Sequence, residues 1–308
     1  MKILCLGHAA YDITVPLDEY PDENTKNRVD TRVECGGGPA SNAAYLLGKW
    51  GMDVYFAGVV GNDEYGRIIK QEFESVNVNT EYLELSSKYR TTSSFIVANK
   101  SNGSRTILTY RSKEMKMSGL NLNFSPDVIL IDGQEYDISK QVLSEYPNAI
   151  SIIDAGRPTP KIIELSKMVN YLVCSKEFAE EVSGIAIDYN DNQTLIDLYS
   201  KMKQIFKNTI VVTLEKKGCL YEFDGQIKIM PSIKVKAVDS TGAGDIFHGA
   251  FTYGIVKQLA FEKILKISNV TGALSVTKIG GRNSVFSLKE MKEAYNEFEW
   301  YYIYRSIS

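Results

Sequence analysis

The sequence predicts an α/β fold with a mostly parallel central sheet and a small antiparallel β lid. From residue 128 on, short apolar runs of strand length alternate with helical segments, which is typical of a parallel sheet covered by helices. Two earlier segments, residues 13–34 and 88–112, alternate apolar and polar residues and favour exposed antiparallel strands. The chain has 308 residues, of which 44% are hydrophobic, enough for one large core. We therefore expect a single domain over residues 1–308, with those two segments as its lid.

Composition excludes several classes of protein. The formal net charge is −3 and no basic patch stands out, which argues against nucleic acid as a partner. No apolar run approaches the roughly 20 residues that span a bilayer, and the apolar start at residues 1–7 is too short for a signal peptide. The four cysteines lack CxxC spacing and there are only two histidines, which argues for reduced core cysteines and against a structural zinc site. We expect a cytoplasmic protein with no membrane partner.

The first third of the chain predicts two buried strands, a helix and a hairpin. Residues 2–7 form an apolar run that ends in glycine, and Asp12 follows it closely. Residues 54–61 predict a second buried strand, and residues 63–76 a helix with one apolar face. Residues 101–104 interrupt two alternating runs, which is typical of a hairpin.

The regular part of the chain predicts where a ligand binds. Apolar runs at residues 128–131, 150–153, 171–173 and 210–214 predict parallel strands, and such sheets bind ligands beyond the carboxyl ends of their strands. Each polar residue there is by itself either a solvated loop residue or a ligand contact, but their joint position favours a site. They are Asp132, Gly133, Gln134, Asp154, Arg157, Ser175, Glu177, Thr213 and Glu215.

The C-terminal third predicts two further helices. Residues 257–278 form one, which we expect Gly280 and Gly281 to stop, and residues 287–300 form a final helix. The aromatic run over residues 300–304 is expected to dock on the body of the protein or on a partner.

Three consecutive glycines, residues 36–38, precede a predicted helix. Glycines in this position mark a sharp bend or a close approach of the backbone to a ligand. Asn42, in the first turn, either hydrogen-bonds a polyol or shares with Ser41 the role of helix cap. The residues alone leave both interpretations open.

A second glycine loop, residues 238–245, turns directly into a helix. Its Gly242-Ala243-Gly244 turn offers unpaired N–H groups at the positive end of a helix dipole, an arrangement that binds phosphate. Asp245 lies at the mouth of this site, where it either accepts a hydroxyl proton during phosphoryl transfer or caps the helix. His248, one turn further on, is interpreted as a helix-packing residue rather than a catalytic one.

Together, the runs over residues 36–44 and 239–245 resemble the two signatures of the PfkB (ribokinase-like) carbohydrate kinases. The stretches over residues 103–107 and 175–177 resemble the ketohexokinase and fructokinase side of that family. The resemblance implies a ribokinase-like three-layer fold. It also implies ATP-dependent phosphorylation of a primary hydroxyl on a ketohexose- or pentose-type sugar, and a homodimer formed through the lid.

The resemblance assigns roles to individual residues. Asp245 would be the base, and the amides of Gly242, Ala243 and Gly244 the anion hole. The substrate-side residues would be Asp12, Gly37, Gly38, Asn42 and Arg157, and the nucleotide-side residues Ser175, Thr213, Glu215, Gly218 and Asn269. Magnesium would accompany ATP, and potassium would bind near Asp239 and Thr241. An Asn-x-x-Glu motif of many members is altered here, with Ser175 in place of the asparagine and Glu177, one position off, as the metal-side carboxylate.

Several alternatives remain on the sequence alone. The basic residues of the lid and strand ends would suit a sugar phosphate, or they are solvated charges; they are Lys26, Arg28, Arg90, Arg105 and Arg157. A nucleoside is another acceptor, and a non-catalytic nucleotide- or sugar-sensing relative is another class, although a sensor needs no base. A dinucleotide-dependent oxidoreductase is excluded because no GxGxxG turn follows the first strand.

Overall fold

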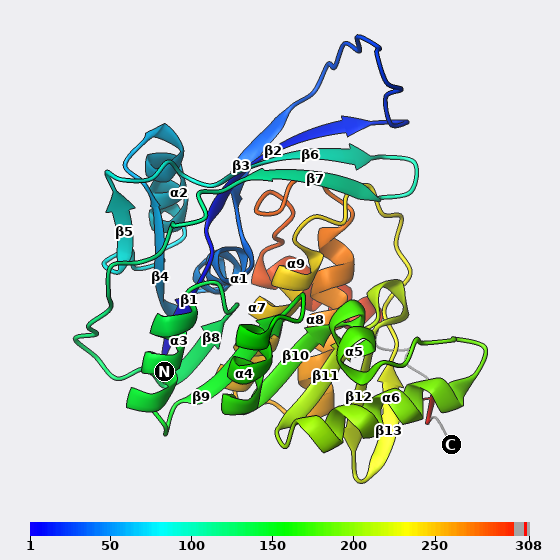
Figure 1. Ribbon diagram of the computed structural model, residues 1–308. Helices are drawn as coiled ribbons and strands as arrows, with labels where there is room; N and C mark the ends of the chain where they lie inside the picture. The colour runs from blue at the N-terminus through cyan, green and yellow to red at the C-terminus, as the bar shows by residue number, and fades with distance from the viewer. Residues whose placement is uncertain (299–304, 307–308) are drawn as a thin grey trace.

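The computed structural model describes residues 1–298 and 305–306, and its centre is a ten-stranded sheet (Figure 1). The strand order is β5-β4-β1-β8-β9-β10-β11-β12-β13-β14. From β5 to β11 all neighbours pair in parallel, and from β11 to β14 they pair antiparallel, so the mostly parallel sheet is confirmed. The strands are β1 (Lys2–Leu6), β4 (Asp53–Gly61), β5 (Leu83–Ser86), β8 (Val128–Ile131), β9 (Ile150–Ala155), β10 (Tyr171–Ser175), β11 (Thr209–Thr213), β12 (Cys219–Phe223), β13 (Gln226–Met230) and β14 (Arg305–Ser306).

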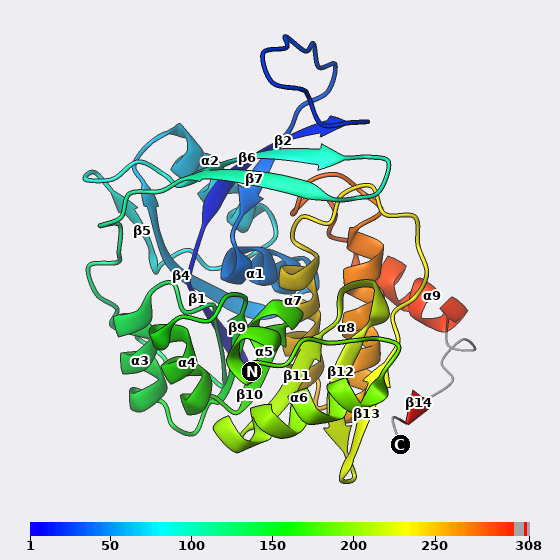
Figure 2. The same cartoon turned by 45° about the vertical axis from the view of Figure 1, so that its right-hand side comes forward.

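Helices cover both faces of this sheet, which gives three layers (Figure 2). One face packs against α1 (Pro39–Lys49), α2 (Glu64–Ser75), α7 (Ala243–Val256), α8 (Phe261–Ser275) and α9 (Leu288–Phe298). The other packs against α3 (Tyr136–Glu145), α4 (Pro160–Met168), α5 (Lys176–Ser183) and α6 (Asn192–Ile205). Leu46 and Phe251 are fully buried on the first face, and Phe178 and Leu198 on the second. The inner parallel strands β1, β8, β9, β10 and β11 are mostly apolar and buried because both of their faces lie in a core.

The smaller sheet is the predicted lid. Its order is β3-β2-β6-β7, built from β2 (Ala10–Leu17), β3 (Val33–Gly37), β6 (Ser93–Asn99) and β7 (Arg105–Tyr110). The β2–β3 and β6–β7 pairs are antiparallel, and the central β2–β6 pair is parallel. The sheet lies across the end of the central sheet at which the parallel strands finish (Figure 1). Residues 22–26 were expected to form a charged loop between the strands, and the exposed loop is longer, covering residues 18–32, which include Pro21.

Two other predictions differ from the structure. The helix expected over residues 257–278 spans only Phe261–Ser275, because residues 257–260 turn between α7 and α8, so Gly280 is not its cap. The β12–β13 hairpin was not predicted, although Asp224 and Gly225 both adopt positive φ there, a turn that an Asp-Gly pair favours. The end of the predicted final helix and the aromatic run over residues 300–304 lie outside the described residues.

The four cysteines are all buried and unpaired, as expected of reduced core residues. Over the described part of the chain, no helix combines the length and the hydropathy needed to cross a bilayer.

Candidate active site

The first glycine loop folds over two groups at the carboxyl end of β1. Asp12, in β2, is only 6% exposed, and a Cβ added to Gly37 would lie 2.0 Å from its Oδ2. Gly38 adopts φ 99°, and a Cβ there would lie 2.4 Å from the carbonyl oxygen of His8. Both positions therefore require glycine, because any side chain would displace the backbone from Asp12 and His8.

The second glycine loop brings Asp245 to the first one. The Oδ2 of Asp245 accepts a hydrogen bond of 2.7 Å from the Nδ2 of Asn42, 203 positions away in the chain. No side chain caps α1 or α7, so the capping interpretation is wrong for both Asn42 and Asp245. Gly242 adopts φ 76°, and a Cβ there would lie 3.4 Å from Asn42 Nδ2, whereas a Cβ on Gly244 would meet nothing within 4 Å. The start of α7 thus faces open space beside a carboxylate.

Asp239 fixes the shape of this second loop. Its side chain is 1% exposed, and Oδ1 accepts bonds from the N–H and hydroxyl of Thr241 at 2.9 and 2.6 Å. Its Oδ2 accepts a 2.8 Å bond from the N–H of Gly280, beyond α8. Since both of its carboxylate oxygens accept hydrogen bonds inside the protein, Asp239 ties the loop before α7 to the loop after α8.

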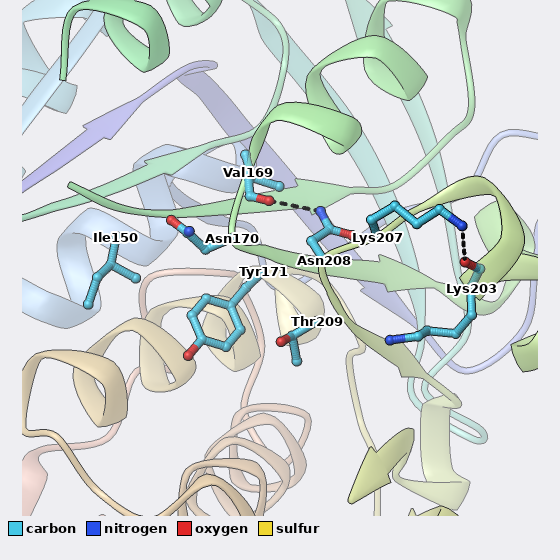
Figure 3. Close-up of a pocket in the computed structure, with 8 residues that line it drawn as sticks. All are labelled: Ile150, Val169, Asn170, Tyr171, Lys203, Lys207, Asn208 and Thr209. Carbon is cyan, nitrogen blue, oxygen red and sulfur yellow. Dashed lines mark hydrogen bonds between the residues drawn. The ribbon is translucent and has the colours of Figure 1, made fainter. Parts of the chain in front are cut away.

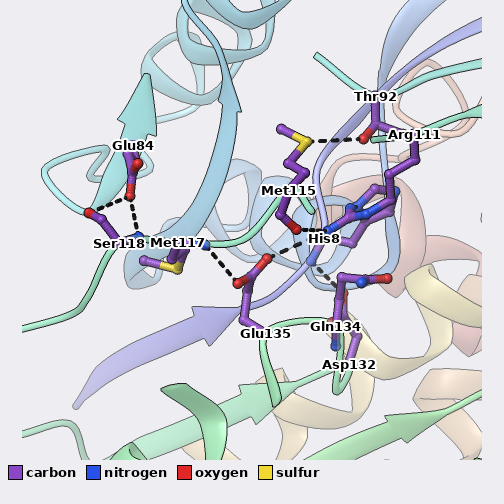
Figure 4. A network of polar contacts seen from close by, with 10 residues as sticks. All are labelled: His8, Glu84, Thr92, Arg111, Met115, Met117, Ser118, Asp132, Gln134 and Glu135. Carbon is purple, nitrogen blue, oxygen red and sulfur yellow. Dashed lines mark hydrogen bonds and ion pairs between the residues drawn. The ribbon is translucent and has the colours of Figure 1, made fainter. Parts of the chain in front are cut away.

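A network of polar side chains surrounds His8, just after β1 (Figure 4). Asp132, directly after β8, accepts bonds from the N–H groups of His8 and Ala40 at 2.7 and 3.2 Å. The guanidinium of Arg111 donates to His8 Nδ1 at 2.5 Å, and to the Met115 carbonyl at 3.1 Å. Arg111 also pairs with buried Glu135 at 3.7 Å. Because an arginine always donates, Nδ1 of His8 accepts and the imidazole is neutral with its proton on Nε2.

The electrostatics of this end of the sheet follow from burial. Burial raises the pKa of Asp12 to about 6; the hydroxyl of Ser94 opposes that rise and the charge of Asp245 adds to it. Burial, and then the charge of Arg111, lowers the pKa of His8 to about 3. Sequence reasoning placed Asp132 at this strand end but missed His8, Arg111 and Glu135, since no local spacing links residues 103 positions apart.

Arg282 joins three elements behind the glycine loop. Its guanidinium is 2% exposed, donates to Ser41 in α1 and pairs with Glu72 in α2, each at 2.5 Å, and stacks 4.3 Å from the Phe73 ring. Glu72 also accepts a 2.8 Å bond from the N–H of Gly36. Sequence reasoning missed this pair as well.

The predicted nucleotide-side residues lie after β10 and β11 and in α8. Gly218 has φ 107°, and a Cβ there would lie 1.9 Å from the Met230 carbonyl, so this position requires glycine. Asn269 is buried and donates to the same Met230 carbonyl at 3.0 Å. Ser175 caps α5 by accepting from Phe178 N at 3.0 Å, and Thr213 donates to the Cys174 carbonyl at 3.2 Å. The short helix η1 (Glu215–Lys217) carries Glu215, which is exposed.

Two other groups of predicted residues are exposed. Glu177 lies in the first turn of α5 with its side chain exposed, while its neighbour Phe178 is fully buried. Among the described residues, no three His, Cys, Asp or Glu side chains gather as a metal site. Lys26, Arg28, Arg90 and Arg157 are also exposed. Arg105 donates from the lid to the Ser240 hydroxyl at 2.6 Å, beside the anion-hole loop.

A second hollow lies at the opposite end of the central sheet (Figure 3). Its lining includes the first residues of three parallel strands, Ile150, Tyr171 and Thr209, together with Lys203 and Lys207 of the α6 end. Lys203 is paired with Glu222 at 3.4 Å. Since the two glycine loops meet at the carboxyl ends of the strands, this groove is separate from the site.

Comparison with known proteins defines the class. Residues 1–287 match the model of the pfkB family carbohydrate kinases, so this chain belongs to that family and is a carbohydrate kinase. It is 24% identical to a ribokinase of Haemophilus influenzae, over 95% of this chain and 97% of that protein. It is 25% identical to a nucleoside kinase of Methanocaldococcus jannaschii, over 91% of each chain. The fold also matches a ribokinase of Arabidopsis thaliana complexed with ribose and ATP, with a TM-score of 0.78 and 21% identity over 96% of this chain and 98% of that one.

Proposed function

We propose that this protein transfers the γ-phosphoryl group of ATP to a primary hydroxyl of a pentose-type sugar. The observation that carries the proposal is the meeting of Asp245, the open start of α7 and the glycine loop over Asp12. A carboxylate beside an anion site suits a base that acts next to a phosphate. The similarity to ribokinases supports a pentose as the acceptor.

The chemistry assigns one task to each group. Asp245 accepts the proton of the acceptor hydroxyl as the oxygen attacks the γ-phosphorus, and the bond to the β–γ bridging oxygen breaks to release ADP. The amides of Gly242, Ala243 and Gly244 stabilise charge on the transferred phosphoryl oxygens. Asp12 and Asn42, with the backbone of Gly37 and Gly38, hold the other hydroxyls of the sugar. On the nucleotide side we assign Ser175, Thr213, Glu215, Gly218 and Asn269, the last two through the local backbone they fix.

Magnesium is part of this proposal because phosphate charge must be offset during transfer. Mg²⁺ in such sites takes most of its ligands from phosphates and water, which fits a site with few protein carboxylates. The exposed carboxylate of Glu177 would reach it through water. Potassium would bind near Asp239 and Thr241, where Oδ2 of Asp239 accepts a single hydrogen bond, from the N–H of Gly280.

Two other acceptors have specific support. The run over residues 103–107 resembles ketohexokinases, which favours a ketohexose, and the relative from Methanocaldococcus jannaschii favours a nucleoside. A sugar phosphate would need an arginine in the site, and Arg105, held by Ser240, is the nearest to the anion-hole loop. If the acceptor is a sugar phosphate, the exposed Arg157 would also bind the substrate.

The test is ADP release with MgATP over a panel of ribose, deoxyribose, fructose, a nucleoside and fructose 6-phosphate. We expect the highest kcat/KM on a pentose, and we expect Asp245→Asn to lower kcat by at least about a thousandfold while nucleotide binding is kept. Asn42→Ala serves as a companion variant, which keeps the base and removes its partner. Turnover by Asp245→Asn at the wild-type rate would exclude Asp245 as the base, and no turnover on any acceptor would favour a sensor.

We further propose a homodimer formed through the lid and a cytoplasmic location. The outer face of the lid exposes Phe95 and Leu108, which pair across β6 and β7 and are 54% and 67% exposed. An apolar stripe of this kind is typical of an interface. Four unpaired cysteines suit a reducing compartment.

A further inference from the structure

The imidazole ring of His248 is buried and lies against three oxygen atoms. His248, in the second turn of α7, is 3% exposed. Its Nδ1 lies 2.6 Å from the carbonyl oxygen of Gly244 and 3.2 Å from Oδ2 of Asp154, at the end of β9. Its Nε2 lies 3.1 Å from the carbonyl oxygen of Val173 in β10.

Once Asp154 is ionised, all three partners of the ring are acceptors. A backbone carbonyl carries no proton, so Val173 requires a proton on Nε2 and Gly244 requires one on Nδ1. A neutral imidazole would direct one lone pair at an oxygen atom inside the core, where an unmade hydrogen bond is unfavourable. The arrangement is satisfied in full only by an imidazolium, whose charge the carboxylate of Asp154 balances.

We propose that His248 is held as an imidazolium by Asp154 and that this pair positions the anion-hole turn. The carbonyl of Gly244 and the N–H of Asp245 belong to one rigid peptide plane. The bond from His248 to that carbonyl therefore holds the peptide that joins Gly244, the last of the three anion-hole residues, to the proposed base Asp245. His248 acts through the backbone and is a positioning residue, not a catalytic one.

The second effect of the pair is on charge. Besides burial and His248, the charges of Asp245 and Asp132 also affect the pKa of Asp154, and both raise it. Burial raises the pKa of Asp154 to about 7, and His248 opposes that rise. Burial, and then the charge of Asp154, raises the pKa of the Cys174 thiol in β10, so this thiol is protonated. A cation against Asp154 removes a negative charge that would otherwise repel the phosphates beside Asp245.

The protonation state can be observed directly because the chain has only two histidines. In a nitrogen-15 correlation spectrum of the imidazole rings, recorded on the wild-type protein near about pH 8, we expect both nitrogens of His248 to be protonated. His8 should show one protonated nitrogen, Nε2, and the variant His8→Gln assigns the two rings. In Asp154→Asn, His248 should lose one of its two protons at the same pH. A single protonated nitrogen on His248 in the wild-type protein, or no change in Asp154→Asn, overturns the proposal.

Kinetics separate this role from simple packing. His248→Asn leaves Asp154 as an unbalanced buried charge, and we expect kcat to fall by about tenfold or more with little change in the KM for the acceptor. In the double variant His248→Asn, Asp154→Asn the charge is removed, and most of the lost kcat should return. If the double variant is as slow as the product of the two single losses predicts, the pair does not act through charge.

This inference deepens the proposed function and rests on it for the kinetic test. The ring spectrum needs neither acceptor nor ATP, so its outcome is independent of which sugar the enzyme uses. If His248 is doubly protonated but the protein has no kinase turnover, the proposed function is wrong and the His248–Asp154 ion pair stands. If the protein is an active kinase but His248 is neutral, the proposed ion pair is wrong and the function stands.

Discussion

At the residue scale, the buried carboxyl of Asp12 lowers the stability of the fold near neutral pH. Its pKa of about 6 in the folded protein lies above the ordinary value of 3.8 for an aspartate, with burial as the main cause. A raised pKa means that the carboxyl stabilises the fold below pH 3.8, and that this contribution is lost as the pH rises through about 6. At neutral pH the folded protein therefore holds a carboxylate that opposes folding, a cost that the proposed role of Asp12 in substrate binding would explain.

We expect Asp12→Asn to raise the free energy of unfolding near neutral pH by about 3 kcal/mol, since the pKa of Asp12 is raised from 3.8 to about 6 and each pKa unit corresponds to about 1.4 kcal/mol. The same variant should raise the acceptor KM by at least about tenfold, because the amide replaces a strong acceptor of sugar hydroxyls. Urea denaturation and steady-state kinetics measure the two effects. Asp18→Asn, an exposed carboxylate just beyond the same strand, is the control and should change neither. A less stable Asp12→Asn protein would contradict the argument.

At the scale of elements, one buried ion pair joins α1, α2 and the loop after α8. Arg282 is 2% exposed and Glu72 is 26% exposed, so the guanidinium depends on that carboxylate for charge balance. Glu72→Gln should lower the free energy of unfolding by about 3 kcal/mol, because it leaves a buried charge without its partner. Glu74→Gln, which breaks an exposed pair with Lys70 in the same helix, should cost less than about 1 kcal/mol. Equal losses in the two variants, measured by denaturant unfolding, would show that the Arg282 pair is not what holds these elements together.

At the scale of the whole molecule, the proposed homodimer rests on the outer face of the lid. Phe95, Leu108 and Tyr110 are between 54% and 67% exposed, and they lie on the outer face of β6 and β7. We expect Leu108→Lys to convert a dimer into a monomer in sedimentation equilibrium, since a charge in an apolar interface is strongly unfavourable. Met168→Lys changes an exposed apolar residue of α4, outside the lid, and should leave the oligomeric state unchanged. A wild-type monomer, or a dimer that survives Leu108→Lys, would contradict a lid interface.

The sequence by itself determined the three-layer fold, the lid and the two loops of the site. These features are local: apolar runs of strand length, glycines where a Cβ has no room, and a turn that opens a helix are all recorded within a few residues. Gly37 and Gly218 show why such positions can be recognised, since a Cβ at either would lie within 2.0 Å of another atom. The β12–β13 hairpin also has a local signal, the Asp224-Gly225 pair, although the hairpin was not predicted.

Only the tertiary structure decided which side chains meet. The Asn42–Asp245 bond joins residues 203 positions apart, and the Arg282–Ser41 bond joins residues 241 apart. In each case either partner, taken alone, fits an exposed helix or loop equally well. The state of His248 depends on two backbone carbonyls and a carboxylate from three different elements. Protonation follows from the sum of such neighbours and not from residue type, so the imidazolium becomes visible only once the strands and α7 are packed together.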